Sequence, residues 1–118
     1  VIGNSYGAGN YAMCGKAYDP RIIVGWPTAE IAVMGAKGAA EIIFKKEIKA
    51  AEDSDATWKE KEKEYADLFA NPYNAAARGY IDEVIFPSET RVKLIKSLKM
   101  LENKVDHLPK KKHGNIPL

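Results

Sequence analysis

Small residues gather in the segment GNSYGAGNYAMCG, which covers residues 3–15 and contains no acidic, basic or histidine side chain. Glycine lets a backbone approach a ligand closely, and unpaired N–H groups just before a helix can stabilise a developing negative charge. One interpretation is therefore an oxyanion hole made of backbone amides. The other is a tight turn without chemistry. The spacings typical of phosphate-binding loops, Gly-x-x-x-x-Gly-Lys and Gly-x-Gly-x-x-Gly, are absent from the segment.

Side chains that often carry catalysis are few in this sequence. It contains one cysteine and two histidines, Cys14, His107 and His113. No histidine or lysine pair near Cys14 would stabilise a thiolate, so we expect a buried structural thiol. We expect both histidines at the surface, because neither is close in the sequence to an acidic cluster or a nucleophile. A single cysteine also excludes a Cys-x-x-Cys metal site, and no metal is predicted.

The length and charge of the chain limit the classes of protein that it can belong to. Its 118 residues correspond to one domain or a piece of one. A net charge of +2, with 29% charged residues, gives no footprint for nucleic acid or for an anionic membrane. No apolar run approaches the roughly 20 residues that span a bilayer. The sequence opens without methionine on an apolar Val-Ile pair, which resembles a strand end, so we expect a fragment of a longer protein.

The elements that would position the glycine-rich segment alternate between strands and helices. A strand end is expected at residues 1–3, and a turn leading into a helix at residues 7–14. Apolar runs predict strands at residues 21–27 and 29–35, and apolar residues at helical spacing predict a helix at residues 36–48. Together these elements indicate an α/β layered core.

Capping signals predict the ends of the later helices. Thr57 and Glu60 form a capping-box pattern at the start of a charged helix. Asn71 can cap a further helix that ends near Gly79. A short strand is expected at residues 80–86, and Ser88 can cap the last helix, which has an apolar stripe. The stripe consists of Val92, Ile95, Leu98, Leu101 (or Met100) and Val105.

Three stretches of the sequence carry a resemblance to a known family. They are SYGAGNYAMCGKAYDPR, WPTAEIAVMGAKGAAEIIF and NPYNAAARGYIDEVIFPSETR with the terminal KKKHGNIPL. In combination they resemble the C-terminal half of the carboxyltransferase (beta) subunit of biotin-dependent acyl-CoA carboxylases, of the propionyl-CoA and methylcrotonyl-CoA carboxylase type. The resemblance covers nearly the whole chain, and only residues 49–67 are generic.

The resemblance implies a fold and a domain organisation. It implies an α/β, crotonase-like superhelix of ββα units, in which residues 1–118 form part of the C-terminal carboxyltransferase domain. The N-terminal domain of the family subunit would be absent. The family active site lies between domains of two subunits, so this chain alone is expected to be inactive. Exposed apolar surface and self-association are expected as well.

The resemblance also assigns roles to the glycine-rich segment. The backbone N–H groups of Ala8 and Gly9 would form the oxyanion hole that stabilises negative charge on biotin. Gly7, Asn10 and Tyr11 would line the site, with Tyr11 at a position that shapes the acyl pocket. Side chains are then unnecessary as general bases, which agrees with their absence from the turn.

The implied function is transfer of CO2 from N-carboxybiotin to the α-carbon of an acyl-CoA, a transferase step within a biotin-dependent ligase. Biotin would arrive on a separate carrier, and the partners would be a biotin carboxyl carrier, a biotin carboxylase and further copies of the full-length subunit, expected as a hexamer. Propionyl-like and methylcrotonyl-like features conflict, so the acyl group stays open. The alternatives are the alpha subunit of a biotin-dependent decarboxylase and a non-catalytic α/β module. The expected compartment is the cytoplasm, with the mitochondrial matrix as the alternative.

Overall fold

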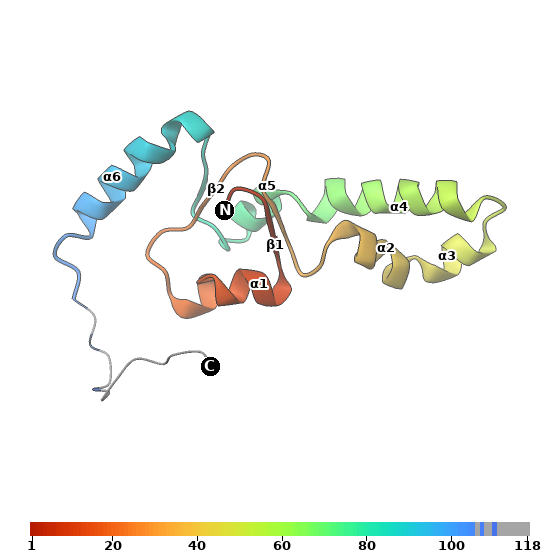
Figure 1. Cartoon of the computed structure of the whole chain (residues 1–118), viewed down its shortest axis with the longest axis horizontal. Helices are drawn as coiled ribbons and strands as arrows, with labels where there is room; N and C mark the ends of the chain where they lie inside the picture. Colours follow the sequence, from red (N-terminus) through yellow and green to blue (C-terminus); the bar gives the residue numbers. More distant parts are fainter. Residues whose placement is uncertain (106, 108–109, 111–118) are drawn as a thin grey trace.

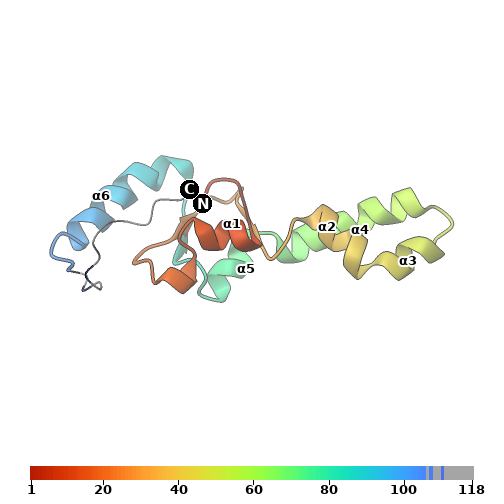
Figure 2. The ribbon, with the colours of Figure 1, turned by 60° about the horizontal axis from the view of Figure 1, so that its bottom comes forward.

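The fold was analysed in a computed structural model, which describes residues 1–105, 107 and 110. The described part is elongated, with extents of 61 × 37 × 23 Å. Figure 1 shows a centre of short strands and the small helices α1 (Gly7–Ala12) and α5 (Pro72–Ala77), with a helical arm on one side and helix α6 (Thr90–Met100) on the other. The view in Figure 2 keeps the arm and α6 on opposite sides of this centre.

Two pairs of short parallel strands form the centre. Strand β1 (Asn4–Tyr6) pairs with β3 (Glu30–Ala32), and β2 (Val24–Gly25) pairs with β4 (Glu83–Val84). The expected strands at residues 21–27, 29–35 and 80–86 are therefore present but shorter. The strand end expected at residues 1–3 is wrong, because the strand covers Asn4–Tyr6 instead. Parallel pairs need long crossover connections, and here helices provide much of the crossover between β2 and β4.

The arm consists of α2 (Ala36–Ile43) and α3 (Lys45–Ala50), both packed against the long helix α4 (Ser54–Phe69). The single helix predicted over residues 36–48 is wrong, because the chain bends at Phe44. Lys61 of α4 contacts both sides of this bend: its Nζ lies 4.9 Å from the centre of the Phe44 ring and 3.3 Å from Oε2 of Glu47. Lys37 lies over the ring of Trp58, 5.8 Å from its centre. Helices α2 and α3 are thus both in contact with side chains of α4.

Asp53, and not Thr57, caps the start of α4. The Asp53 carboxylate accepts hydrogen bonds from the N–H groups of Asp55 at 3.1 Å and Ala56 at 3.0 Å. Thr57 lies inside the helix and donates its hydroxyl to the Asp53 carbonyl at 2.9 Å. The capping box predicted at Thr57 and Glu60 is therefore wrong, because a stronger cap precedes it in the sequence.

Helix α5 (Pro72–Ala77) has the ends that the sequence predicted. The side chain of Asn71 accepts from the N–H of Asn74 at 3.0 Å, and Pro72 occupies the first helical position. At the other end, Gly79 has φ +73°. The N–H of Gly79 donates to the Ala76 carbonyl at 3.0 Å, and the N–H of Tyr80 donates to the Ala75 carbonyl at 2.9 Å. These two bonds form a Schellman motif, which fixes the direction in which the chain leaves the helix.

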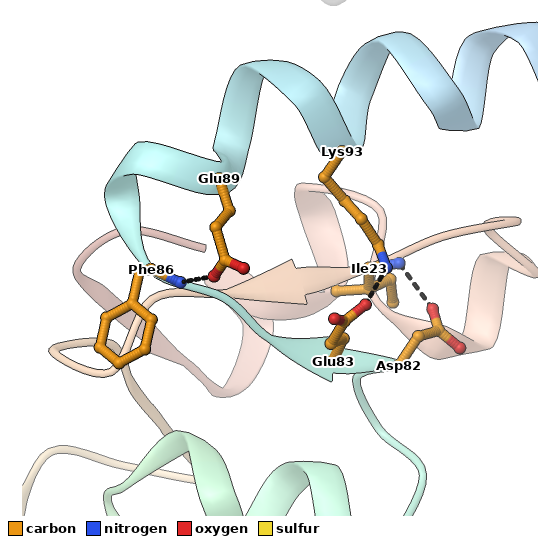
Figure 3. Close-up of polar contacts among 6 residues, drawn as sticks. All are labelled: Ile23, Asp82, Glu83, Phe86, Glu89 and Lys93. Atoms are coloured by element: carbon orange, nitrogen blue, oxygen red, sulfur yellow. Dashed lines mark hydrogen bonds and ion pairs between the residues drawn. The ribbon is translucent and has the colours of Figure 1, made fainter.

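Polar contacts attach helix α6 (Thr90–Met100) to the strands. A short 3₁₀ turn, Pro87–Glu89, precedes it, and Ser88 lies inside this turn, so the predicted cap at Ser88 is wrong. The Glu89 carboxylate instead accepts from the N–H of Phe86 at 2.8 Å, and Lys93 forms an ion pair with Glu83 (Figure 3). The indole N–H of Trp26 donates to the Thr90 hydroxyl at 2.9 Å.

The buried core is small and consists mostly of small side chains. The buried apolar residues are Ala29, Ala39, Ala40, Tyr65, Ala70, Ala75, Ile81 and Ile85. Many large apolar side chains are exposed instead, including Val92, Ile95 and Leu98 of α6, where Leu98 is 69% exposed. Val105, the last residue of the expected stripe, lies beyond the end of α6 at Met100. The expectation of exposed apolar surface is thus confirmed, while self-association stays a prediction. In the described part of the chain, no helix combines the length and the hydropathy needed to cross a membrane.

Replacement of Asp53 by alanine tests the cap of α4. We expect D53A to lower the free energy of unfolding by about 1 kcal/mol, because two helix N–H groups lose their acceptor. T57V, which leaves the Asp53 carboxylate in place, serves as the control and should have the smaller effect. Urea unfolding followed by circular dichroism measures both. An effect of T57V as large as that of D53A would contradict this cap.

The contact between strands β1 and β3 predicts a pH dependence. The Tyr6 hydroxyl donates to the Glu30 carboxylate, and burial, followed by this bond and the Glu30 charge, raises the pKa of Tyr6 from 10.0 to about 12. A raised pKa favours the folded state while Tyr6 is protonated, so this stabilisation is complete below pH 10 and is lost as the pH rises through about 12. Y6F should therefore be less stable than the original chain at pH 8, by about 1 kcal/mol. The difference should shrink above pH 10, and a difference that is constant from pH 8 to 12 would contradict the assignment.

Candidate functional site

The glycine-rich segment forms the junction between strand β1 and helix α1 (Gly7–Ala12). Gly7 has φ +44°, a left-handed conformation that other residues adopt at a cost. A Cβ atom at this position would lie 2.7 Å from the carbonyl oxygen of Val33, just beyond the end of β3. Glycine is therefore required at position 7, because it lets the start of α1 approach the end of β3.

The first turn of α1 presents N–H groups without partners. The first N–H groups of a helix have no acceptor inside the helix, and Tyr6, the residue before it, provides no side-chain cap. No hydrogen bond among the described residues involves the N–H of Ala8 or Gly9. Both residues are exposed, and a Cβ atom on Gly9 would meet nothing within 4 Å. These two amides are thus available to an acceptor from outside the described part.

A cavity of about 470 Å³ lies beside this turn, between α1, β3, α4 and α5. It is lined by Gly7, Asn10, Tyr11, Gly15, Lys16, Ala17, Ile31, Ala32, Val33, Tyr65, Phe69, Asn74, Ala75, Arg78 and Tyr80. Three of the five residues that the sequence singled out therefore line it, at helical spacing on one face of α1. Ala8 and Gly9 are not among the lining residues. The cavity and the unpaired amides are neighbours on α1 and do not coincide.

The lining of the cavity is apolar and aromatic, with positive charge and no acidic residue. Tyr65 and Phe69 of α4 form part of the wall, and their ring centres are 5.1 Å apart. Tyr11 contacts Tyr18, with ring centres 4.6 Å apart, and a hydrogen bond with Tyr11 raises the pKa of Tyr18. Such a site accommodates an apolar group that carries neutral or negative polar atoms.

Several residues of the cavity could not be assigned from the sequence. Tyr65 and Phe69 belonged to an apolar stripe on a predicted helix, which is the usual pattern of core packing. Tyr65 is buried, but Phe69 is 47% exposed. Arg78 and Tyr80 flank the glycine at the end of α5, where no motif indicated a site. Only the fold brings these residues to the glycine-rich turn.

The cysteine and histidine predictions have different outcomes. Cys14 is exposed and has φ +71°, so the expectation of a buried thiol is wrong. The reason is that it follows the end of α1 in a surface turn. His107 is exposed, as expected, and His113 lies outside the described residues. Among the residues that the structure describes, no group of three or more His, Cys, Asp or Glu side chains is placed to hold a metal ion.

Comparisons with known proteins agree on one family. Residues 1–116 match the family "Carboxyl transferase domain". The chain is 53% identical over its full length to the methylmalonyl-CoA decarboxylase subunit alpha of Propionigenium modestum. It is 49% identical over its full length to the putative propionyl-CoA carboxylase beta chain of Bacillus subtilis. In both cases it spans only 23% of the length of the relative.

Solved structures give the same result for the fold. The chain superposes on a transcarboxylase 12S crystal structure, described as a hexamer with methylmalonyl-coenzyme A bound, with a TM-score of 0.87 and 50% identity. The superposition covers 100% of this chain and 23% of that one. The expected α/β, crotonase-like fold is therefore confirmed.

Substitution by alanine should affect stability differently at the two glycines of the turn. G7A should lower the free energy of unfolding by more than about 1 kcal/mol, because the new Cβ would meet the Val33 carbonyl and the residue would be held at positive φ. G9A should leave stability unchanged or raise it slightly, since its Cβ enters open space and alanine favours a helix. Urea unfolding measures both, and equal effects would contradict the close approach at Gly7.

Proposed function

Because this chain belongs to the carboxyl transferase domain family, we propose that it is part of the carboxyltransferase component of a biotin-dependent enzyme. That component would move CO2 between N-carboxybiotin and the α-carbon of an acyl-CoA. The observation that carries this proposal is the family match over residues 1–116. The chain spans 22–23% of its relatives, so the proposal concerns a longer protein, of which residues 1–118 would be part of the C-terminal carboxyltransferase domain.

We propose propionyl-CoA and methylmalonyl-CoA as the acyl-CoA pair. The two differ by the transferred carboxyl group, and the relatives named above act at one or the other end of this conversion. Their identities to this chain, 53% for the decarboxylase and 49% for the putative carboxylase, are too similar to decide the direction. Carboxylation is our first proposal and decarboxylation the second, supported by the decarboxylase relative. A methylcrotonyl-like substrate is not supported by these names.

The N–H groups of Ala8 and Gly9 are the donors that we propose for the oxyanion hole. Both are unpaired in the described part, and the space around Gly9 is open, since a Cβ atom there would meet nothing within 4 Å. Bound biotin would supply a ureido ring whose nitrogen carries CO2. The two amides would donate to its oxygen and stabilise negative charge there, an effect typically worth a factor of about 10²–10³ in rate for each donor. Gly7 would hold the turn in place, while Asn10 and Tyr11 would border the ring.

The remaining components of the enzyme would come from outside this chain. We propose that biotin arrives on a carrier domain and is loaded by a biotin carboxylase. The acyl-CoA would be held by another domain of the full-length subunit, which would assemble as a homo-oligomer of hexamer type. The 118-residue chain alone would therefore be inactive. The cytoplasm is the proposed compartment, with the mitochondrial matrix as the alternative, because CoA esters are present in both.

A titration of the 118-residue chain with biotin amide tests the proposed site. The amide is uncharged, like biotin attached to a carrier. We expect amide shifts in ¹⁵N spectra confined to residues 7–11, at millimolar ligand because tethering normally supplies the effective concentration. G9A should weaken these shifts, since it adds a methyl group next to the proposed donors.

G38A is the matched control for the titration, because Gly38 is also a helical glycine with open space around it. It should leave the shifts unchanged. If the folded chain shows no shift at millimolar biotin amide, or if G9A behaves like G38A, the proposed donors are wrong for this chain.

A further inference from the structure

We propose that Arg78 binds the carboxylate that the reaction transfers, and that the cavity between α1, α4 and α5 receives the carboxylated group. This inference rests on the proposed function, since it assumes a carboxylated substrate at the α1 turn. Arg78 lies at the end of α5 and lines the cavity together with Asn10 and Tyr11 of α1. It would be a specificity residue, which distinguishes a carboxylated ligand from the same ligand without CO2.

The charges around the cavity support an anionic ligand. Of the residues that the structure describes, two basic ones, Lys16 and Arg78, line it and no acidic one does. Lys16 already has a partner, because its Nζ lies 3.8 Å from the Asp82 carboxylate. The guanidinium group of Arg78 has no ion pair or hydrogen bond with the described part of the chain. Arg78 is therefore the cation that a carboxylate entering this cavity can neutralise.

The backbone holds Arg78 in a defined position. Its N–H donates to the Asn74 carbonyl at 3.3 Å, and the Schellman motif at Gly79 and Tyr80 follows directly. At the other end of α5, the Asn71 cap fixes the first turn. The helix also packs against β3 and β4. A charged side chain on such a fixed backbone loses less entropy on binding than one on a free loop.

The other walls of the cavity indicate which kind of anion fits. Aromatic rings and the aliphatic side chains of Ile31 and Val33 surround the polar groups. An apolar wall disfavours a fully hydrated inorganic ion and favours a carboxylate attached to a small organic group. The planar guanidinium group matches a carboxylate with two parallel hydrogen bonds. Both a dicarboxylic acyl group and a carboxylated ureido ring have this chemistry.

Two small probes distinguish these sources of the carboxylate. Methylmalonate represents the acyl group, and allophanate, the carboxylated form of urea, represents the ureido ring. Each is titrated at pH 8 into the ¹⁵N-labelled 118-residue chain, and the Arg78 side-chain N–H and the backbone amides are followed. We expect R78Q to weaken binding about tenfold, the loss of a charge-assisted pair, with R78K in between. The probe that binds more tightly identifies the source.

R91Q is the matched control, because Arg91 lies on α6 and outside the lining of the cavity. It should bind both probes like the original chain. Equal affinities of R78Q and the original chain, or an equal loss in R91Q, would overturn the proposal. Biotin amide shifts at residues 7–11 in R78Q report on the fold and on the proposed function separately. If they persist while carboxylate binding is unaffected by R78Q, only this inference fails.

Discussion

The approach of helix α1 to the end of strand β3 is the contact on which the rest of the site depends. At Gly7 the backbone lies so close to the Val33 carbonyl that a Cβ atom would be 2.7 Å from its oxygen. Gly7, Asn10 and Tyr11 of α1 and the apolar residues Ile31 and Ala32 of β3 line the same cavity beside this contact. The first turn of α1 follows directly, and within the described part of the chain the N–H groups of its residues Ala8 and Gly9 have no partner. Gly7 thus lies next to both the cavity and the two amides that we propose as donors.

The rest of the chain is held by a small core and by specific polar contacts. Alanines make up much of the buried apolar set, so burial of large side chains contributes little to the centre of the fold. Contacts between distant segments take its place, such as Tyr6 with Glu30, Trp26 with Thr90, and the Ile23 N–H with Asp82 at 2.7 Å. Such a balance agrees with a chain that spans 22–23% of its relatives. Large exposed apolar side chains are the surface against which the rest of such a protein would pack.

The sequence predicted those features that depend on a few neighbouring residues. Asn71, Pro72 and Gly79 define helix α5 through local chemistry, and the structure has each in its expected place. The cap predicted at Thr57 is wrong because Asp53, four residues earlier, offers a better acceptor to the N–H groups of the same helix. At the bend, Phe44 and Glu47 contact Lys61, which is distant in the sequence, so helical spacing alone could not reveal these contacts. The cavity was the hardest feature to predict, since Tyr65, Phe69 and Arg78 come close to α1 only in the folded chain.

Sites built from main-chain donors differ from sites built from side chains in how they respond to mutation and to pH. Every residue except proline brings the same N–H group, so substitutions around the first turn of α1 can reshape access to Ala8 and Gly9 without deleting a donor. A backbone amide also has no proton that titrates in the physiological pH range, so its strength as a donor does not change with pH there. Of the proposed donors and the lining residues, only the latter, such as Tyr11, change the chemistry of the site when their side chains are substituted.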